Sequence, residues 1–328
     1  MVLSTHYREP SQEPWQGRKD APANTYFFQM VQLLNLTQTM PKIDRPAFVL
    51  IGFICDEGIR RNHGRVGAAE GPNAIRKCLG PLPFHRQNIE CYDAGNITCV
   101  DEDLERAQTA LSDVIAQLLE NKFIPIVLGG GHELAWGHYQ GIEKTLTHQQ
   151  LGIINFDAHF DMRPLLAENK GSSGTPFLQI AKAHQSKTKR FDYNCIGIQT
   201  SSNMPQLFAT ANEYGAQFLL ADDLQVGKNE KTIPFIQRII KDNDVLYVSL
   251  CLDVFAAPFA PGVSAPQTFG LTPWQVLPLI RQLAKSNQVI SYDIAELSPP
   301  FDIDQRTAKL AAQFIHEIIH HHATEDQG

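Results

Sequence analysis

The stretch from Leu151 to Asp161, LGIINFDAHFD, indicates the fold class. Its first six residues are almost all apolar and include two isoleucines. A continuous apolar run of this length, without strict alternation, is typical of a strand that is buried on both faces of a parallel sheet. Three side chains that can bind a metal, Asp157, His159 and Asp161, follow where the run ends. Ligands of open α/β sheets bind beyond the carboxyl ends of the strands.

Runs of the same kind recur along the chain and predict about eight strands. They cover Phe48–Phe53, Ile89–Gly95, Ile124–Gly130, Leu151–Asp157, Cys195–Ile198, Gln217–Leu220, Val245–Asp253 and Val289–Glu296. Apolar stripes at helical spacing lie between or after them, at Leu104–Leu119, Thr232–Ile240, Pro273–Ala284 and Leu310–Ile319. Strands that alternate with helices predict an α/β fold with a mostly parallel sheet.

Composition narrows the function classes. The chain has 328 residues, 28 of them basic and 35 acidic, and a formal net charge of −7, which argues against nucleic-acid binding. No apolar run is long enough for a membrane span, and the polar start does not resemble a signal peptide. The six scattered cysteines predict reduced thiols and a cytoplasmic location. We expect an N-terminal arm over residues 1–40, with one short helix, and a single α/β domain over residues 41–328.

Side chains at the ends of three predicted strands predict a metal site. Alternate side chains of an extended strand point to one side, so Asp157, His159 and Asp161 can converge on a cation. The other candidate ligands at strand ends are His132, Cys251 and Asp253. Six ligands exceed the needs of one tetrahedral ion and suit two ions with a bridging carboxylate. Their mix of imidazole and carboxylate favours Mn, Fe, Co or Zn over Ca or Mg.

Two other features are interpreted without a metal. His316, His320, His321 and His322 lie near the C-terminus, where no carboxylates follow in order, so we expect a solvated helix face or tail. Glu133 follows His132 and is interpreted as an acidic residue at a helix N-terminus, where negative charge is favourable.

The blocks GGGHE, NFDAHFDMR and SLCLDVFAAPFAPGVSAP together resemble the signature blocks of the ureohydrolase family, which contains arginase, agmatinase and formimidoylglutamase. WQGR, RNHGR, SSGTPF, APGVSAP and DIAELSPPFDID are most similar to the formimidoylglutamase branch. The resemblance implies a three-layer α/β/α sandwich and two Mn²⁺ ions per subunit. One ion would take His132, Asp157, Asp161 and Cys251; the other would take Asp157, His159, Cys251 and Asp253.

Three positions depart from the arginase pattern. Cys251 stands where the family has a bridging aspartate, so a thiolate could favour other divalent metals, and a protonated thiol would hold the second ion weakly. Ser173 matches the position of the histidine proton shuttle of arginases, so we expect a substrate contact there and no shuttle. Arg163 replaces a small polar amide, and its planar guanidinium suits a substrate carboxylate.

The resemblance implies hydrolysis of N-formimino-L-glutamate to L-glutamate and formamide, as in histidine degradation. Asp161 would act as general acid and base, and Glu296 would bind the cationic amidine. Alternatives are another ureohydrolase, such as a guanidino-acid hydrolase or an agmatinase, or a family member whose metal binding is impaired through Cys251. The substrate is a small molecule, with no organic cofactor, and the resemblance suggests a homo-oligomer.

Overall fold

The computed structural model describes residues 5–224 and 231–323. Their strands form one ten-stranded sheet. The strands are β1 (Tyr7–Arg8), β2 (Val31–Leu33), β3 (Ala47–Ile54), β4 (Glu90–Thr98), β5 (Ile124–Leu128), β6 (Leu151–Phe156), β7 (Asp192–Ile198), β8 (Gln217–Leu220), β9 (Val245–Cys251) and β10 (Val289–Ala295).

The order β4-β3-β5-β10-β9-β6-β7-β8 contains the eight strands that the apolar runs predict, and all of these pair in parallel. The strands β5, β10, β9 and β6 are consecutive neighbours in the middle of the sheet. Because neighbouring parallel strands end at the same edge, the residues that follow these four strands lie close together.

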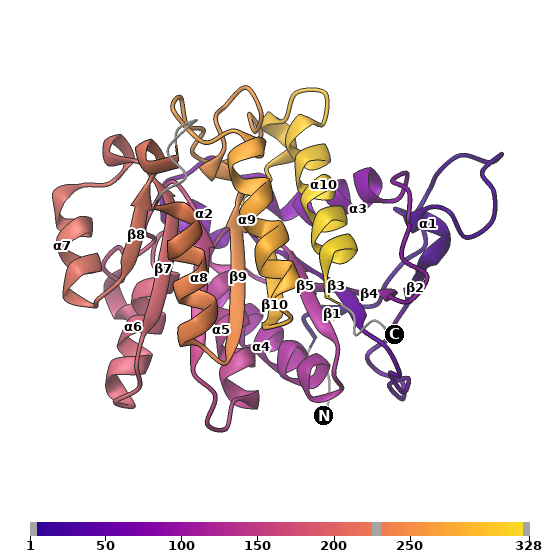
Figure 1. Cartoon of the computed structure of the whole chain (residues 1–328), viewed down its shortest axis with the longest axis horizontal. Helices are drawn as coiled ribbons and strands as arrows, with labels where there is room; N and C mark the ends of the chain where they lie inside the picture. The colour runs from indigo at the N-terminus through magenta and orange to yellow at the C-terminus, as the bar shows by residue number, and fades with distance from the viewer. Residues whose placement is uncertain (1–4, 225–230, 324–328) are drawn as a thin grey trace.

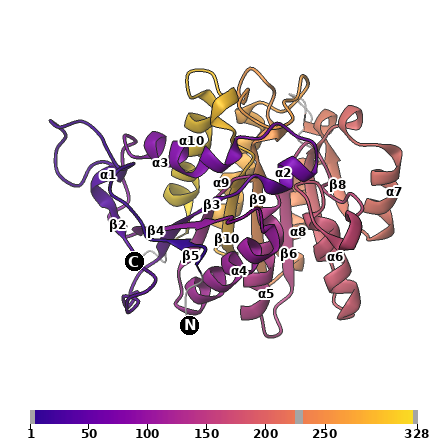
Figure 2. The ribbon, with the colours of Figure 1, turned by 180° about the vertical axis from the view of Figure 1, so that it is seen from behind.

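Helices cover both faces of the sheet, so the predicted three-layer fold is confirmed (Figures 1 and 2). One hydrophobic core includes apolar residues of α3, α8, α9 and α10, and the other includes those of α4, α5, α6 and α7. The helices are α1 (Phe27–Met30), α2 (Glu57–Arg61), α3 (Gly71–Leu79), α4 (Leu104–Glu120), α5 (Leu134–Thr145), α6 (Pro176–Ser186), α7 (Pro205–Glu213), α8 (Thr232–Asp242), α9 (Pro273–Lys285) and α10 (Arg306–His321).

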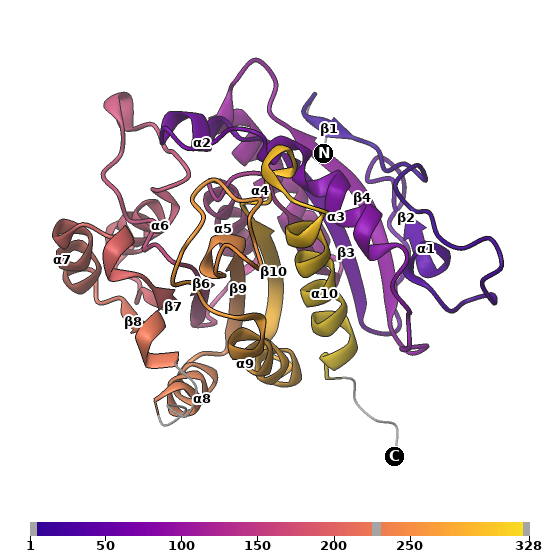
Figure 3. The same ribbon diagram turned by 90° about the horizontal axis from the view of Figure 1, so that it is seen from above.

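The N-terminal segment contains the expected short helix, α1, and also two strands that were not expected. β1 pairs antiparallel and β2 pairs parallel with β4, whose other side pairs with β3. Trp15 is buried, and its indole N–H donates to Asp93 Oδ2 at 2.8 Å. Arg76 pairs with the other oxygen of Asp93 at 2.8 Å, also in the interior. Figure 3 shows this segment lying beside β4 at one end of the sheet.

Within residues 5–224 and 231–323, none of the helices combines the length and apolar character needed to cross a bilayer.

Candidate metal centre

The candidate ligands and the candidate substrate-binding residue Glu296 lie at the carboxyl ends of the central strands. His132 follows β5, Asp157 follows β6, Cys251 ends β9, and Glu296 follows β10. All four are at least 97% buried. The strand order thus brings together residues that are up to 164 positions apart in the sequence, as in the His132–Glu296 contact.

The backbone between Asp157 and Asp161 does not alternate as an extended strand, so that expectation was wrong. The chain bends at Ala158 and His159, and Asp161 has a left-handed φ of 48°. The Asp157 carboxylate holds the bend, because it accepts the His159 N–H at 2.7 Å. Asp253 likewise lies in a 3-10 turn (Leu252–Val254) rather than in β9. The ligands converge through these turns.

Two groups of three side chains have their potential ligand atoms within 4.8 Å of one another. The first contains His132, Asp157 and Cys251, and the second contains Asp157, His159 and Asp253. Asp157 belongs to both and has the position of a bridging carboxylate. Asp161 lies against the first group, with its Oδ2 2.9 Å from His132 Nδ1. Cys251 belongs to the first group alone, although the resemblance implied a place in both.

The two histidines each face two carboxylates. His132 Nδ1 lies 3.0 Å from Asp157 Oδ2, and His159 Nδ1 lies 3.1 Å from Asp253 Oδ2. Burial lowers the pKa of both rings, but the neighbouring carboxylates outweigh it and raise both pKa values well above the ordinary histidine value. The site therefore favours a positive charge between these groups, which either a proton or a metal ion provides.

Hydrogen bonds behind His132 fix the direction of its ring. Ser249 Oγ lies 2.8 Å from His132 Nε2 and donates to Asp293 Oδ1 at 2.6 Å. Asp293 Oδ2 accepts from the Tyr247 hydroxyl and contacts His138 Nδ1 at 2.8 Å. Because Ser249 gives its only proton to Asp293, it accepts the Nε2 proton of His132, so that Nδ1 is the ring atom that faces the carboxylates and can bind a proton or a metal ion.

Asp157 is held in a similar way. Its Oδ2 accepts from Asn155 Nδ2 at 3.1 Å, and Asn155 also donates to the Tyr193 hydroxyl at 3.1 Å. Tyr193 in turn donates to the Phe160 carbonyl at 2.9 Å. Sequence reasoning missed Asn155, Ser249 and Asp293, and the signal that could have found them was a polar side chain inside a buried apolar strand.

The residues fit a pair of divalent ions. His132 Nδ1 and Asp253 Oδ1 are buried polar atoms that have no hydrogen-bond partner among the described residues. An unpaired buried carboxylate oxygen costs about 1–3 kcal/mol or more, and a cation would satisfy it. The donor set of imidazole, carboxylate and one sulfur suits transition metals.

Among these candidate ligands, Cys251 is the one that binds a metal ion poorly in its ordinary, protonated form. Burial, together with the negative charges of Asp157 and Asp253, raises the pKa of its thiol well above the ordinary value. The thiol therefore stays protonated unless a cation stabilises the thiolate. The same carboxylates that make a cation favourable make a free thiolate unfavourable here.

Glu296 borders the ligands through both carboxylate oxygens. Oε1 accepts the backbone N–H of His132 at 2.8 Å, and Oε2 accepts from the Ser264 hydroxyl. Burial and the charge of Asp253 raise the pKa of Glu296 to about 7, and burial and Asp157 raise that of Asp161 to about 6. Glu133 lies at the N-terminus of α5, as the sequence predicted, where it is fully buried and accepts the Gly58 N–H at 3.0 Å.

Arg163 and Ser173 lie in neighbouring loops beside this centre. The Arg163 N–H donates to the Gly174 carbonyl at 2.8 Å, and its side chain lies over Gly174, where an added Cβ would be 2.7 Å from Arg163 Cδ. Ser173 is buried and donates its N–H to the Gly58 carbonyl at 3.0 Å. Arg163 is half-buried, and its side chain forms no ion pair with any residue in the described ranges.

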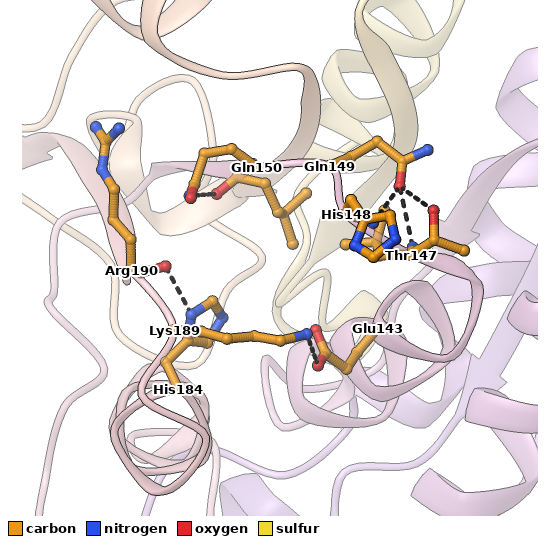
Figure 4. A pocket seen from close by; sticks show the side chains of 10 residues that line it. Glu143, Thr147, His148, Gln149, Gln150, His184, Lys189 and Arg190 are labelled. Carbon is orange, nitrogen blue, oxygen red and sulfur yellow. Dashed lines mark hydrogen bonds and ion pairs between the residues drawn. The ribbon is translucent and has the colours of Figure 1, made fainter.

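A separate small pocket of about 140 Å³ lies at the opposite edge of the sheet, around the starts of β6 and β7 (Figure 4). Its cations already have partners: Lys189 pairs with Glu143 at 2.7 Å, and Arg190 pairs with Asp192 at 3.0 Å. This pocket is not part of the candidate metal centre.

Comparisons with known proteins agree on one family. Residues 46–321 match the Arginase family. The chain is 43% identical to formimidoylglutamase from Legionella pneumophila (strain Lens) over 316 residues, 96% of this chain and 98% of that protein. It is 42% identical to formimidoylglutamase from Clostridium tetani, with 97% of each chain covered. The crystal structure of Trypanosoma cruzi formiminoglutamase with Mn²⁺ has a TM-score of 0.75 and 25% identity, with 87% of this chain and 95% of that chain covered.

Proposed function

The chain belongs to the arginase family, and we propose that it hydrolyses N-formimino-L-glutamate with water to L-glutamate and formamide. Two relatives that are 42% and 43% identical over nearly their full length carry the name formimidoylglutamase, which supports this substrate. The observation that carries the choice of an acidic substrate is Arg163, a half-buried cation without an ion-pair partner among the described residues.

We further propose that two Mn²⁺ ions occupy the centre, and the Mn²⁺ in the crystal structure of Trypanosoma cruzi formiminoglutamase supports this choice of metal. His132, Asp157, Asp161 and Cys251 would hold one ion, and Asp157, His159 and Asp253 would hold the other. When bound, such a pair supplies Lewis acidity and makes water a nucleophile near neutral pH.

The chain's own residues position the substrate and move its protons. Glu296 binds the cationic amidine through its carboxylate, which Ser264 and the His132 N–H orient. Asp161 takes a proton from the nucleophile and gives it to the leaving nitrogen. Arg163 binds a glutamate carboxylate at the far end of the substrate, and Ser173 lies beside it. Because Ser173 replaces the arginase shuttle histidine, proton transfer rests on Asp161.

A family member with impaired metal binding is the second candidate, because the buried Cys251 thiol carries a raised pKa. A cytoplasmic location and a homo-oligomeric assembly also remain proposals. The free state of the six cysteines supports the first, and the family resemblance supports the second.

The first test compares substrates. Protein loaded with Mn²⁺ should release formamide from N-formimino-L-glutamate and leave agmatine and arginine unchanged.

The second test compares variants. Arg163→Leu should raise KM by about 10²-fold, since a charged hydrogen bond to the substrate is lost, with a smaller effect on kcat. The control is Arg306→Leu, at a half-exposed arginine on α10. Turnover of agmatine, or an unchanged KM in Arg163→Leu, would reject the proposed substrate, and fewer than two ions per chain without turnover would favour the impaired form.

A further inference from the structure

Two cysteines lie side by side just past the paired ends of β3 and β4. The last register pair of these parallel strands is Ile54 with Thr98, and the Cys99 N–H donates to the Ile54 carbonyl at 3.0 Å. Cys55 and Cys99 are the residues that directly follow this pair. Neighbours in parallel register point to the same face, and strands lie about 4.8 Å apart. That spacing is within the Cα separation of about 4.4–6.8 Å that a disulfide spans.

The two cysteines pack into the same hydrophobic core but differ in exposure. Cys55 is a buried member of this core and is 2% exposed, whereas Cys99 is half-buried and packs against it. The neighbouring Cys55 thiol lowers the pKa of Cys99, and the charge of Arg61 adds to this effect, whereas burial and the charges of Glu57 and Asp103 oppose it. The Cys99 thiol and burial raise the pKa of Cys55. A half-buried thiol with a lowered pKa beside a buried thiol with a raised pKa is the arrangement of a reactive and a resolving cysteine.

We infer that Cys99 and Cys55 form a redox modification site that peroxides oxidise to a disulfide. The Cys99 thiolate attacks one oxygen of hydrogen peroxide and becomes a sulfenic acid, while the second oxygen leaves and, after protonation, becomes water. The Cys55 sulfur then attacks Cys99, the S–S bond forms, and the sulfenic oxygen leaves as a second water. In sum, two thiols and one peroxide give one disulfide and two waters.

Cys55 also connects this pair to the metal centre. Its carbonyl accepts the Gly131 N–H at 3.0 Å, directly before His132. The glycine loop has no spare room there, since a Cβ on Gly130 would lie 1.8 Å from the Cys55 carbonyl oxygen. Closing the S–S bond brings the two sulfurs to about 2.05 Å, so the Cys55 side chain and backbone must adjust and should shift the loop that carries His132. We expect the disulfide to lower turnover, and this part of the inference rests on the proposed function.

The first experiment treats the full chain with equimolar hydrogen peroxide and analyses its peptides by mass spectrometry without reduction. We expect a peptide linked through Cys55 and Cys99, a fall from six to four titratable thiols after denaturation, and recovery of six with dithiothreitol. Cys55→Ser should leave Cys99 as a sulfenic acid that dimedone labels. Cys78 is the matched control, because it is also half-buried but has a raised pKa and contacts Gln305 rather than a second thiol. The inference is overturned if no linked peptide forms, or if Cys78 is oxidised as fast as Cys99.

The second experiment measures formamide release before and after oxidation. Turnover should fall at least severalfold, recover with dithiothreitol, and stay constant in Cys99→Ser, which lies outside the catalytic machinery. Unchanged turnover in protein that contains the linked peptide would overturn the inference that the disulfide disturbs the metal centre. If the reduced protein does not turn over N-formimino-L-glutamate, the proposed function fails, and the peptide experiment still decides whether the thiol pair reacts.

Discussion

Two groups of histidines in this chain have opposite environments. His132 and His159 lie at the carboxyl edge of the sheet, and each faces two carboxylates at close range. The C-terminal histidines were expected on a solvated face or tail, but His316, His320 and His322 pack against aromatic rings. The His320 ring lies 5.9 Å from Phe27 and 5.5 Å from Phe84, between ring centroids, and the His322 ring lies 5.2 Å from Phe48.

Both nitrogens of His320 are used in its neutral form. Nδ1 contacts the His316 carbonyl at 2.7 Å, and Nε2 accepts the His85 N–H at 2.9 Å. Burial, with the nearby His316, lowers the pKa of His320 to about 4, whereas carboxylates raise the pKa of His132 despite its burial. A density of histidines in the sequence therefore does not indicate a metal site; buried carboxylates beside them do.

The largest expected difference between the metal-centre histidines and the C-terminal histidines comes from substitutions at Asp157 and His320. Asp157 belongs to both groups of candidate ligands. Asp157→Asn should remove both ions and lower turnover by about 10³-fold or more, because each ion loses a ligand. Elemental analysis and formamide release measure this. His320→Ala, in the C-terminal group, should keep both ions and full turnover. Retention of two ions in Asp157→Asn would contradict the bridging position.

The next effect concerns the hydrogen bonds behind His132. Asp293→Asn removes the charge that accepts from Ser249 and Tyr247, so the His132 ring loses its fixed direction. Loss of such a supporting group lowers metal affinity by about 10–100-fold. Titration with Mn²⁺ under chelator competition measures the affinity, and circular dichroism confirms folding. An affinity equal to that of the unaltered chain would show that Asp293 serves packing alone.

A smaller effect is expected at Cys251. Cys251→Asp replaces a thiol with a raised pKa by a carboxylate, which a hard cation such as Mn²⁺ prefers, so affinity should rise about tenfold. Cys251→Ser is the matched control, since it keeps the size and removes the thiolate. If Cys251→Asp holds Mn²⁺ no better than Cys251→Ser, Cys251 is a packing residue and not a ligand.

The smallest expected effect is the pH dependence of the free energy of unfolding, to which the C-terminal histidine His320 contributes. The folded pKa of His320, about 4, lies below its unfolded value of about 6.5. Its neutral form therefore stabilises the fold fully above about pH 6.5, and this contribution is lost as the pH falls toward 4. Because the ring is partly exposed, we expect a loss on the order of 1 kcal/mol between pH 7 and 5. Urea unfolding should show a smaller acid loss in His320→Gln; an identical loss would assign the acid sensitivity to other groups.

The eight parallel strands could be predicted because each is a continuous apolar run that follows a helix-forming segment or a turn. The strands β1 and β2 could not, since two and three residues are too few to show a period. Their positions depend on pairing with β4, more than 50 residues away, which local pattern does not contain.

The ligand side chains of the candidate metal centre were recognisable because they follow apolar runs. The turns that bring them together were not, because the left-handed φ of Asp161 and the 3-10 turn at Asp253 depend on contacts across the sheet. Ser249 and Asp293 were overlooked because each sits within an apolar run, where only the neighbouring strand reveals its partner. The C-terminal histidines were misjudged because their aromatic partners Phe27, Phe48 and Phe84 are distant in sequence.

The pairing of β1 and β2 with β4 has a consequence for handling the protein. Both short strands occupy the side of β4 that faces away from β3, so they cover backbone N–H and C=O groups that would otherwise form an open sheet edge. An open edge can pair with the same edge of a second molecule and start aggregation. The hydrogen bond from the Trp15 indole N–H to Asp93 holds the N-terminal segment against β4. A chain shortened by its first 40 residues should thus keep every candidate metal ligand and yet precipitate as it is concentrated.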